Sequence, residues 1–160
     1  MVSELFRNAQ SSVLLAGYAV YKGQKVFRAL AERMSDMPAL QVRMFLEVPR
    51  KQGDTSSADS LIARFSHQFK SSEWPAGMPL PNVYCCKQFL ENLYGKSASL
   101  HAKCIVVDNQ HVFVSSANFT EAAQQRNVEI GLLLQSEVVG QRISRFFETL
   151  ADTGYFARIL

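Results

Sequence analysis

The sequence of 160 residues predicts an α/β domain with a mixed, largely parallel central β-sheet and helices on both faces. Residues 12–20 form an apolar run, residues 24–34 carry apolar side chains at helical spacing, and residues 40–48 alternate between apolar and polar. Strand, helix and strand at this spacing form a βαβ unit with a parallel pair and a right-handed crossover. Since 48% of the residues are hydrophobic and 19% charged, we expect one globular domain over residues 1–160.

The first elements follow from the spacing of their apolar residues. Residues 3–10 are compatible with a short helix, and residues 12–20 (SVLLAGYAV) indicate a buried strand. The helix at 24–34 is amphipathic because its apolar side chains fall three or four positions apart. The strand at 40–48 ends at Pro49, because proline disfavours continuation of regular structure.

A polar loop at residues 50–57 precedes the second half of the chain. The segments that follow are a helix at 58–70 with Leu61, Ile62, Phe65 and Phe69 on one side, an ordered loop at 71–81 with three prolines, a strand at 83–86, an irregular stretch at 88–99, a hairpin from residue 100, a strand at 127–134 and an amphipathic helix at 137–150. We find no internal repeat and no low-complexity segment.

The hairpin places polar side chains next to one another. Residues 104–107 (CIVV) indicate a buried strand, residues 108–110 a turn, and residues 112–114 the returning strand. His101 and Lys103 are two residues apart, so they project from one face of an extended chain. Residues 116 and 118 share this relationship, and the hairpin would bring them back toward the first pair.

These side chains fit the attack on a phosphodiester. His101 offers a nucleophilic imidazole, and Lys103 and Asn118 offer donors to phosphate oxygens. Burying a lysine in an apolar strand is costly unless it is paired, which argues against a purely structural Lys103. Asn118 could also be a turn residue or a helix cap, and Ser116 could contact phosphate or only brace the loop. Asp108 begins the turn at an odd offset from His101, which indicates a structural role.

The pattern His101-x-Lys103-x₄-Asp108, followed by Ser116-x-Asn118 and by Asn127-Val128-Glu129, resembles the signature of the phospholipase D superfamily. In length and in its single copy of the motif, the chain is similar to the small bacterial endonucleases and phosphodiesterases of that superfamily. Some members of this type belong to bacterial defence systems against phage. The chain departs at Ser115, where the family usually has glycine.

The resemblance implies an α-β-α sandwich and a covalent phosphohistidine at His101, with no metal or other cofactor. It also implies that Glu129 accepts a hydrogen bond from the second ring nitrogen of His101. A salt bridge from Glu129 to Arg126 or to another basic residue is the alternative. In this family two copies of the motif meet at one site, so we expect a homodimer with the site at its two-fold interface.

Composition bounds the remaining classes of function. The net charge of +3 and the pI near 8.8 are compatible with an anionic partner but do not indicate one by themselves. Three cysteines, two of them adjacent, do not indicate a disulfide framework and are read as reduced thiols. Their spacing is not that of a zinc site. Neither a signal peptide nor an apolar run of membrane-spanning length is recognisable, so we expect a cytoplasmic protein without membrane insertion.

Three hypotheses for the substrate stay open. The first is a nuclease for DNA or RNA, whose backbone could be followed by the loop cations Lys22, Lys25, Arg50, Lys51, Lys87 and Lys96. The second is a lipid phosphodiesterase, whose apolar rim could comprise Trp74, Met78, Leu80, Phe89, Leu93 and Tyr94. The third is a binding module for nucleic acid without turnover, within a larger complex of defence subunits.

Overall fold

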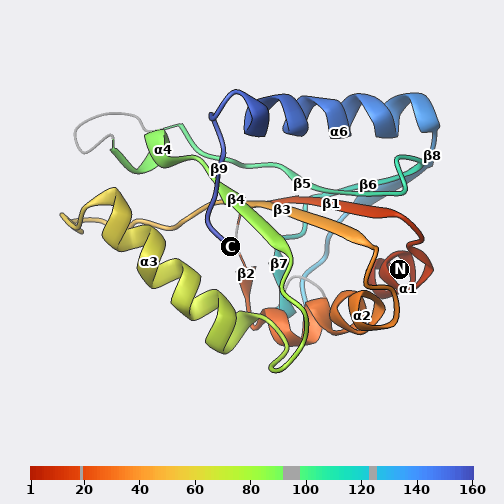
Figure 1. Cartoon of the computed structure of the whole chain (residues 1–160), viewed down its shortest axis with the longest axis horizontal. Helices are drawn as coiled ribbons and strands as arrows, with labels where there is room; N and C mark the ends of the chain where they lie inside the picture. The colour runs from red at the N-terminus through yellow and green to blue at the C-terminus, as the bar shows by residue number, and fades with distance from the viewer. Residues whose placement is uncertain (19, 92–97, 123–125) are drawn as a thin grey trace.

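The computed structural model describes residues 1–18, 20–91, 98–122 and 126–160, and its centre is a seven-stranded sheet (Figure 1). The strand order is β8 (Gly131–Gln135), β6 (His111–Ser115), β5 (Lys103–Val107), β1 (Ser12–Gly17), β3 (Gln41–Leu46), β4 (Asn82–Cys85) and β9 (Ala157–Arg158). A separate two-stranded sheet joins β2 (Val20–Tyr21) to β7 (Phe119–Thr120). The helices are α1 (Val2–Asn8), α2 (Gly23–Asp36), α3 (Ala58–Gln68) with the π-helical turn η1 (Phe69–Glu73), α4 (Lys87–Glu91) and α6 (Glu137–Asp152).

The sheet is mixed, as predicted, but its parallel part is smaller than expected. β1 pairs in parallel with β3, and β3 with β4, which confirms the βαβ unit around α2. All other neighbours in this sheet are antiparallel, including β1 with β5. The prediction of a largely parallel sheet is therefore only partly right. The central β1–β5 pair joins segments about ninety residues apart in sequence, and nothing in the local pattern specifies its direction.

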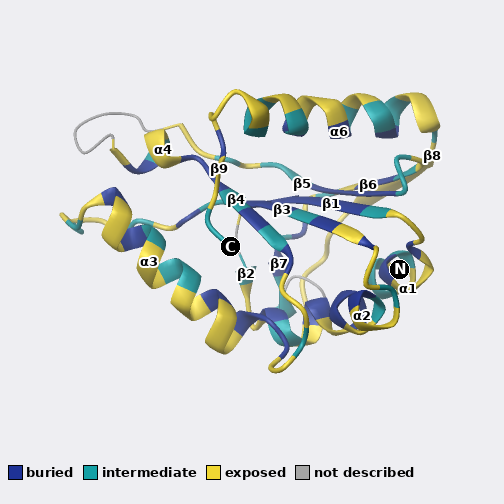
Figure 2. Ribbon diagram, viewed as in Figure 1, coloured by how far each residue is buried: buried dark blue, intermediate teal, exposed yellow. Residues whose placement is uncertain are grey.

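Two apolar layers lie on opposite faces of the sheet. α6 covers one face, and α1, α2 and α3 lie on the other (Figure 1). The pleat of β1 divides its side chains accordingly, since Val13 and Leu15 join the α1–α2 core while Leu14 and Ala16 join the α6 core. Strand interiors are buried and the outer surface of α6 is exposed (Figure 2). These layers are the helices on both faces that the sequence predicts.

Some predicted boundaries differ from the structure. The first strand ends at Gly17, and its predicted continuation becomes the short β2. The predicted strand at 127–134 begins only at Gly131. The stretch at 88–99, predicted to be irregular, contains part of α4, and residues 92–97 lie outside the described part of the chain.

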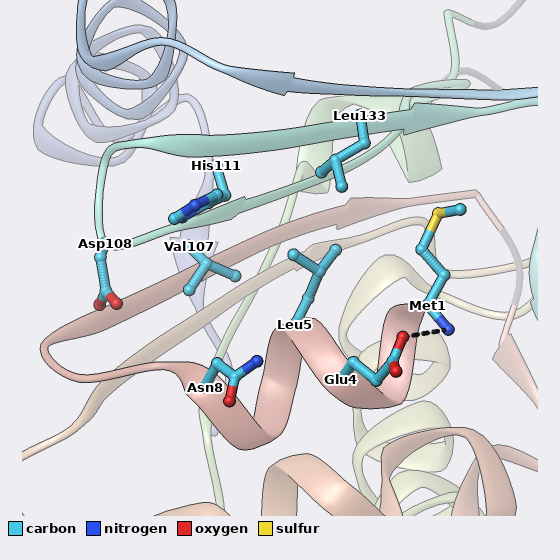
Figure 3. Close-up of a pocket in the computed structure, with 8 residues that line it drawn as sticks. All are labelled: Met1, Glu4, Leu5, Asn8, Val107, Asp108, His111 and Leu133. Atoms are coloured by element: carbon cyan, nitrogen blue, oxygen red, sulfur yellow. Dashed lines mark ion pairs between the residues drawn. The ribbon is translucent and has the colours of Figure 1, made fainter.

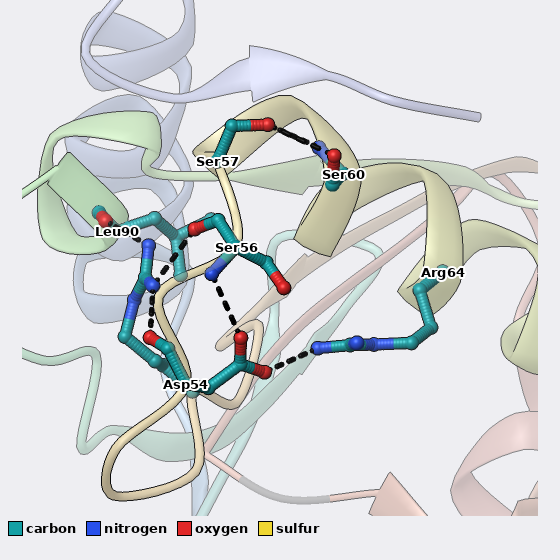
Figure 4. Close-up of polar contacts among 7 residues, drawn as sticks. Asp54, Ser56, Ser57, Ser60, Arg64 and Leu90 are labelled. Carbon is teal, nitrogen blue, oxygen red and sulfur yellow. Dashed lines mark hydrogen bonds and ion pairs between the residues drawn. The ribbon is translucent and has the colours of Figure 1, made fainter.

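The loop after β3 is held by a network of polar contacts (Figure 4). The guanidinium of Arg50 donates to the carbonyl oxygens of Asp54, Ser56 and Leu90 at 2.6–2.9 Å. The carboxylate of Asp54 accepts from the backbone N–H of Ser56 and pairs with Arg64 at 2.6 Å. Hydrogen bonds from Ser56 and Arg64 lower the pKa of Asp54. Arg50 therefore has a structural role and is occupied by backbone carbonyls.

The three cysteines, Cys85, Cys86 and Cys104, are free and buried. Burial raises the pKa of the Cys85 thiol to about 12 and that of Cys104 to about 11. Both thiols are therefore protonated at neutral pH, as the prediction of reduced core thiols requires.

Candidate functional site

His101 and Lys103 meet at the start of β5. His101 is exposed just before the strand, and Lys103 is the first strand residue. The Lys103 Nζ lies 3.3 Å from the His101 Nε2 and 3.0 Å from its carbonyl oxygen. An ammonium can only donate, so Nε2 accepts and carries a lone pair. This contact fits the tautomer that has the imidazole proton on Nδ1 and the Nε2 lone pair facing the ammonium.

The ring of Tyr18 lies against both of these side chains. Its ring lies edge-to-face with the His101 ring at a centroid distance of 5.0 Å, and the Lys103 Nζ lies 5.6 Å from the Tyr18 centroid. The register explains this placement, because Gly17, the last residue of β1, pairs with Lys103. Tyr18 could not be identified from the sequence, since only the antiparallel β1–β5 pairing brings it to the histidine.

Glu129 lies on an exposed segment before β8, and not within an apolar strand as predicted. The Ser116 Oγ donates to its carboxylate and accepts from the backbone N–H of Ile130, while the Ser116 N–H donates to the Ile130 carbonyl at 3.0 Å. The Asn127 amide donates to Glu129 at 3.2 Å. The expected hydrogen bond from His101 to Glu129 is thus replaced by bonds from Ser116 and Asn127, and the alternative partner Arg126 forms no ion pair with Glu129.

Charge nevertheless links Glu129 to the other residues of the site. Hydrogen bonds from Ser116 and Asn127 lower the pKa of Glu129, and the charge of Lys103 lowers it further. The carboxylate is therefore ionised and lies within electrostatic reach of Lys103. Ser116, for which two roles were open, braces the loop that carries Glu129.

Phe119, the residue that follows Asn118, packs on the strand residue that pairs with Lys103. A Cβ at position 17 would lie 2.5 Å from the Phe119 ring, so the ring packs directly on the backbone of Gly17. Gly17 pairs with Lys103, and the Asn118 carbonyl accepts from the Thr120 N–H at 2.8 Å. Asn118 thus lies directly before β7, in the segment that follows β6.

Replacing Gly17 with alanine should displace Phe119 and, with it, Asn118. We expect a loss of about 2 kcal/mol in the free energy of unfolding, because overpacking a tight contact costs about 1–3 kcal/mol. Urea denaturation of the variant and the wild type measures this difference in the free energy of unfolding. The double variant Gly17→Ala, Phe119→Val should regain part of the loss, since the shorter side chain leaves room for the methyl group. A single variant as stable as the wild type would contradict the close approach.

Asp108 is the structural residue that the sequence predicts. Its carboxylate accepts from the backbone N–H groups of Gln10, Ser11 and Ser12 at 2.7–3.1 Å, and from the Ser11 hydroxyl. Burial acts to raise the pKa of Asp108, but these hydrogen bonds together lower it below its usual value. Asp108 thereby fixes the entry of β1 against the turn between β5 and β6.

Comparison with known proteins identifies the family. A family model described as "Cardiolipin synthase, PLD-like domain" matches residues 2–151. The chain belongs to the phospholipase D superfamily. The chain is 30% identical over 162 residues to the DISARM protein DrmC of Bacillus paralicheniformis, covering 100% of this chain and 58% of DrmC. It therefore spans little more than half the length of that relative.

Two solved structures share the phospholipase D fold. A phospholipase D family member, Nuc from Salmonella typhimurium, superposes with a TM-score of 0.62 and 16% identity, covering 98% of this chain and 87% of Nuc. The phosphatidylserine synthase of Haemophilus influenzae Rd KW20 gives a TM-score of 0.62 and 11% identity, covering 98% of this chain and 36% of the synthase. At these identities the likeness establishes the fold alone.

Ser115 is accommodated where the phospholipase D signature usually has glycine. The non-glycine residues with positive φ in the described part are Lys22, Asp108 and Asn109, so position 115 does not use the left-handed region. The Ser115 hydroxyl donates to the Ile130 carbonyl and accepts from the Ala117 N–H. Serine thus supplies hydrogen bonds that support the motif loop.

Most of the cations proposed to follow a nucleic-acid backbone are engaged within the protein. Lys22 and Lys25 both pair with Glu121, and Lys87 pairs with Asp59 at 2.8 Å. Arg50 holds the loop after β3, and Lys96 lies outside the described residues. The structure therefore does not single out these cations as an anionic-substrate groove.

A cavity of about 390 Å³ lies at the other end of β5, between α1 and the strands (Figure 3). Its lining includes Leu5, Val107, His111 and Leu133. His111 is half-buried beside it. Because the cavity is at the turn end of β5 and His101 precedes the strand, the two are separate.

Glu47, which follows β3, holds the segment in front of His101. Its carboxylate accepts from the Leu100 N–H at 2.9 Å, and its own N–H donates to the Gly17 carbonyl. Burial raises the pKa of Glu47, although the bond from Leu100 acts against this. Glu47 supports the position of this segment, and the sequence pattern does not reveal it because its partner is a backbone group.

The raised pKa of Glu47 predicts a pH-dependent effect of Glu47→Gln. The stability contributed by a carboxyl with a raised pKa is present below the pKa of the unfolded chain and is lost as pH rises through the folded value. Glutamine keeps the acceptor without the charge. The variant should match the wild type at pH 4 and melt a few degrees higher at pH 8, as measured by thermal unfolding across pH. The exposed Glu32→Gln is the control. A Glu47→Gln variant with the same melting temperature as the wild type at both pH values would contradict the prediction.

In the described residues, no helix is both long enough and apolar enough to cross a membrane.

Proposed function

We propose that the protein is a metal-independent phosphodiesterase, and specifically a nuclease that cleaves DNA or RNA through a covalent phosphohistidine at His101. The observation that carries the proposal is the contact of the Lys103 ammonium with the His101 Nε2 at 3.3 Å. It supports a neutral imidazole whose lone pair lies beside a cation able to bind a phosphate oxygen. Membership of the phospholipase D superfamily supports the same class of chemistry.

The reaction proceeds in two displacements. The His101 Nε2 forms a bond to phosphorus while the bond to the leaving oxygen breaks, and that oxygen needs a proton from a general acid. Water then attacks phosphorus, the N–P bond breaks, and the general acid, now a base, takes the proton of water. Lys103 and Asn118 would hold the non-bridging oxygens in both steps, and Glu129 would balance the positive charge of the site.

The general acid would be His101 of a second copy of the chain. Exposed apolar side chains next to Glu129 support a docked partner: Val128 and Ile130 on either side are 103% and 80% exposed. All five residues of β8 are exposed, and β8 is an edge strand with apolar Leu132, Leu133 and Leu134. Burying this surface in a two-fold dimer would also close the site.

Mixed dimers test the shared site. When wild-type and His101→Asn chains are mixed in equal amounts and allowed to exchange, roughly a quarter of the dimers should carry two histidines, and activity should fall accordingly. Light scattering at the assay concentration gives the mass of the protein in solution and so distinguishes a dimer from a monomer. An active monomer, or activity proportional to the wild-type fraction alone, would overturn the dimeric site.

Nucleic acid is favoured over lipid because much of the predicted lipid-facing rim is core. Trp74 is 1% exposed, and Met78 and Phe89 pack against the apolar clusters. Leu80 is exposed, whereas Leu93 and Tyr94 lie outside the described residues. The similarity to the DISARM protein DrmC supports a role beside other defence subunits.

An assay in EDTA separates the candidate functions. The protein is incubated with single-stranded DNA, double-stranded DNA, RNA and phosphatidylcholine vesicles, each with His101→Ala as the control. We expect cleavage of a nucleic acid that depends on His101. A requirement for divalent ions would refute the mechanism, and lipid turnover alone would refute the substrate class. Salt-sensitive binding without turnover would instead favour the binding module.

A further inference from the structure

We propose that Tyr18 is a positioning residue whose aromatic ring holds His101 and Lys103 in their reactive arrangement. The inference rests on the proposed function for its kinetic consequence, but the arrangement itself can be measured without substrate. Tyr18 is 41% exposed, so burial in the core does not account for the position of its ring. Its two ring contacts are to the side chains that carry the proposed chemistry.

The ring acts on each partner in a different way. The negative face of an aromatic ring attracts an ammonium within about 6 Å, which limits the free rotation of the long Lys103 side chain. The edge-to-face contact at 5.0 Å restrains the His101 ring, whose segment precedes the strand and has no ladder of its own. Because the Glu129 carboxylate is bonded to Ser116 and Asn127, this restraint does not come from Glu129.

The ring, and not the hydroxyl, carries this role. No hydrogen bond joins the Tyr18 hydroxyl to the described residues, whereas both contacts with the site involve the ring. Position 18 is fixed by its neighbour, since Gly17 pairs with Lys103 and its carbonyl accepts from the Glu47 N–H. Phenylalanine should therefore replace Tyr18, and leucine should not.

The test compares Tyr18→Phe and Tyr18→Leu with Tyr155→Leu, an exposed tyrosine whose ring contacts Phe89 and Phe156 instead. In the free protein, long-range ¹H–¹⁵N NMR reports the tautomer of His101, and ring-current shifts report the neighbouring ring. Wild type, Tyr18→Phe and Tyr155→Leu should show the Nδ1–H tautomer with shifted imidazole protons. Tyr18→Leu should lose the ring-current shift and populate both tautomers.

Kinetics on the preferred nucleic acid give the second measurement. Tyr18→Leu should lower kcat about tenfold with little change in KM, since misplacing reactive groups by about 1 Å can cost up to 10²-fold. Tyr18→Phe should retain kcat. Equal losses in both variants, or unchanged imidazole signals and kcat in Tyr18→Leu, would overturn the proposal. If the wild type cleaves no substrate, the proposed function fails and the NMR comparison still decides the role of Tyr18.

Discussion

His101→Asn should lower turnover by about 10⁴-fold or more, because nucleophile and base act as a unit and removing one forfeits most of the rate. Asparagine keeps a polar side chain of similar reach but cannot form the phosphorus–nitrogen bond. The exposed His67→Asn on α3 is the matched control and should cleave like the wild type. Initial rates in EDTA on the preferred nucleic acid measure the difference.

The covalent intermediate gives an independent measurement of the same variant. Substrate labelled with ³²P should transfer label to the wild-type chain when the reaction is stopped in denaturant at alkaline pH, and acid should release that label. His101→Asn should acquire none. Label on the variant, or a fall in rate no larger than that of His67→Asn, would exclude His101 as the nucleophile.

The local parts of the fold could be predicted because short-range patterns encode them. The hairpin of β5 and β6 follows from an apolar run, a turn at Asp108 and a second run, and the structure has this register. The β1–α2–β3 unit follows from a helical period between two strands. The pairing of β1 with β5 could not be predicted, because the pattern of a buried strand is the same for a parallel and an antiparallel neighbour.

The same distinction applies to the candidate site. His101 and Lys103 were predicted to meet because residues two apart in an extended chain share a face, and their contact at 3.3 Å agrees with this although the strand itself begins at Lys103. Glu129 was placed in a strand because its neighbours Val128 and Ile130 are apolar, yet both are exposed. An apolar pattern records the tendency of a segment to be buried and does not say whether its own chain or a partner buries it. Tyr18 depends on the long-range pairing and was therefore missed.

Lys103→Met should lower kcat by about 10²- to 10³-fold, the usual cost of removing one group that stabilises developing charge. Methionine keeps an unbranched apolar stem, so the start of β5 should remain folded and the loss should reflect the missing ammonium. The variant also removes the donor to the His101 Nε2, so both ring tautomers should be populated in the free protein. Lys87→Met, which removes a surface pair with Asp59, is the control.

The charge of Lys103 has a second, measurable effect on Glu129. Hydrogen bonds from Ser116 and Asn127 lower the pKa of this carboxyl, and the lysine lowers it further. In Lys103→Met the Glu129 pKa should therefore rise toward its usual value, which ¹³C NMR of the carboxyl can follow. Lys103→Arg keeps the charge and should leave the Glu129 pKa low, while its planar guanidinium replaces the compact ammonium and should restore only part of kcat. A normal kcat in Lys103→Met, or an unchanged Glu129 pKa, would place the lysine outside the site. A lowered kcat together with a raised Glu129 pKa would tie the proposed nucleophile, the phosphate donor and the acidic group to one electrostatic unit.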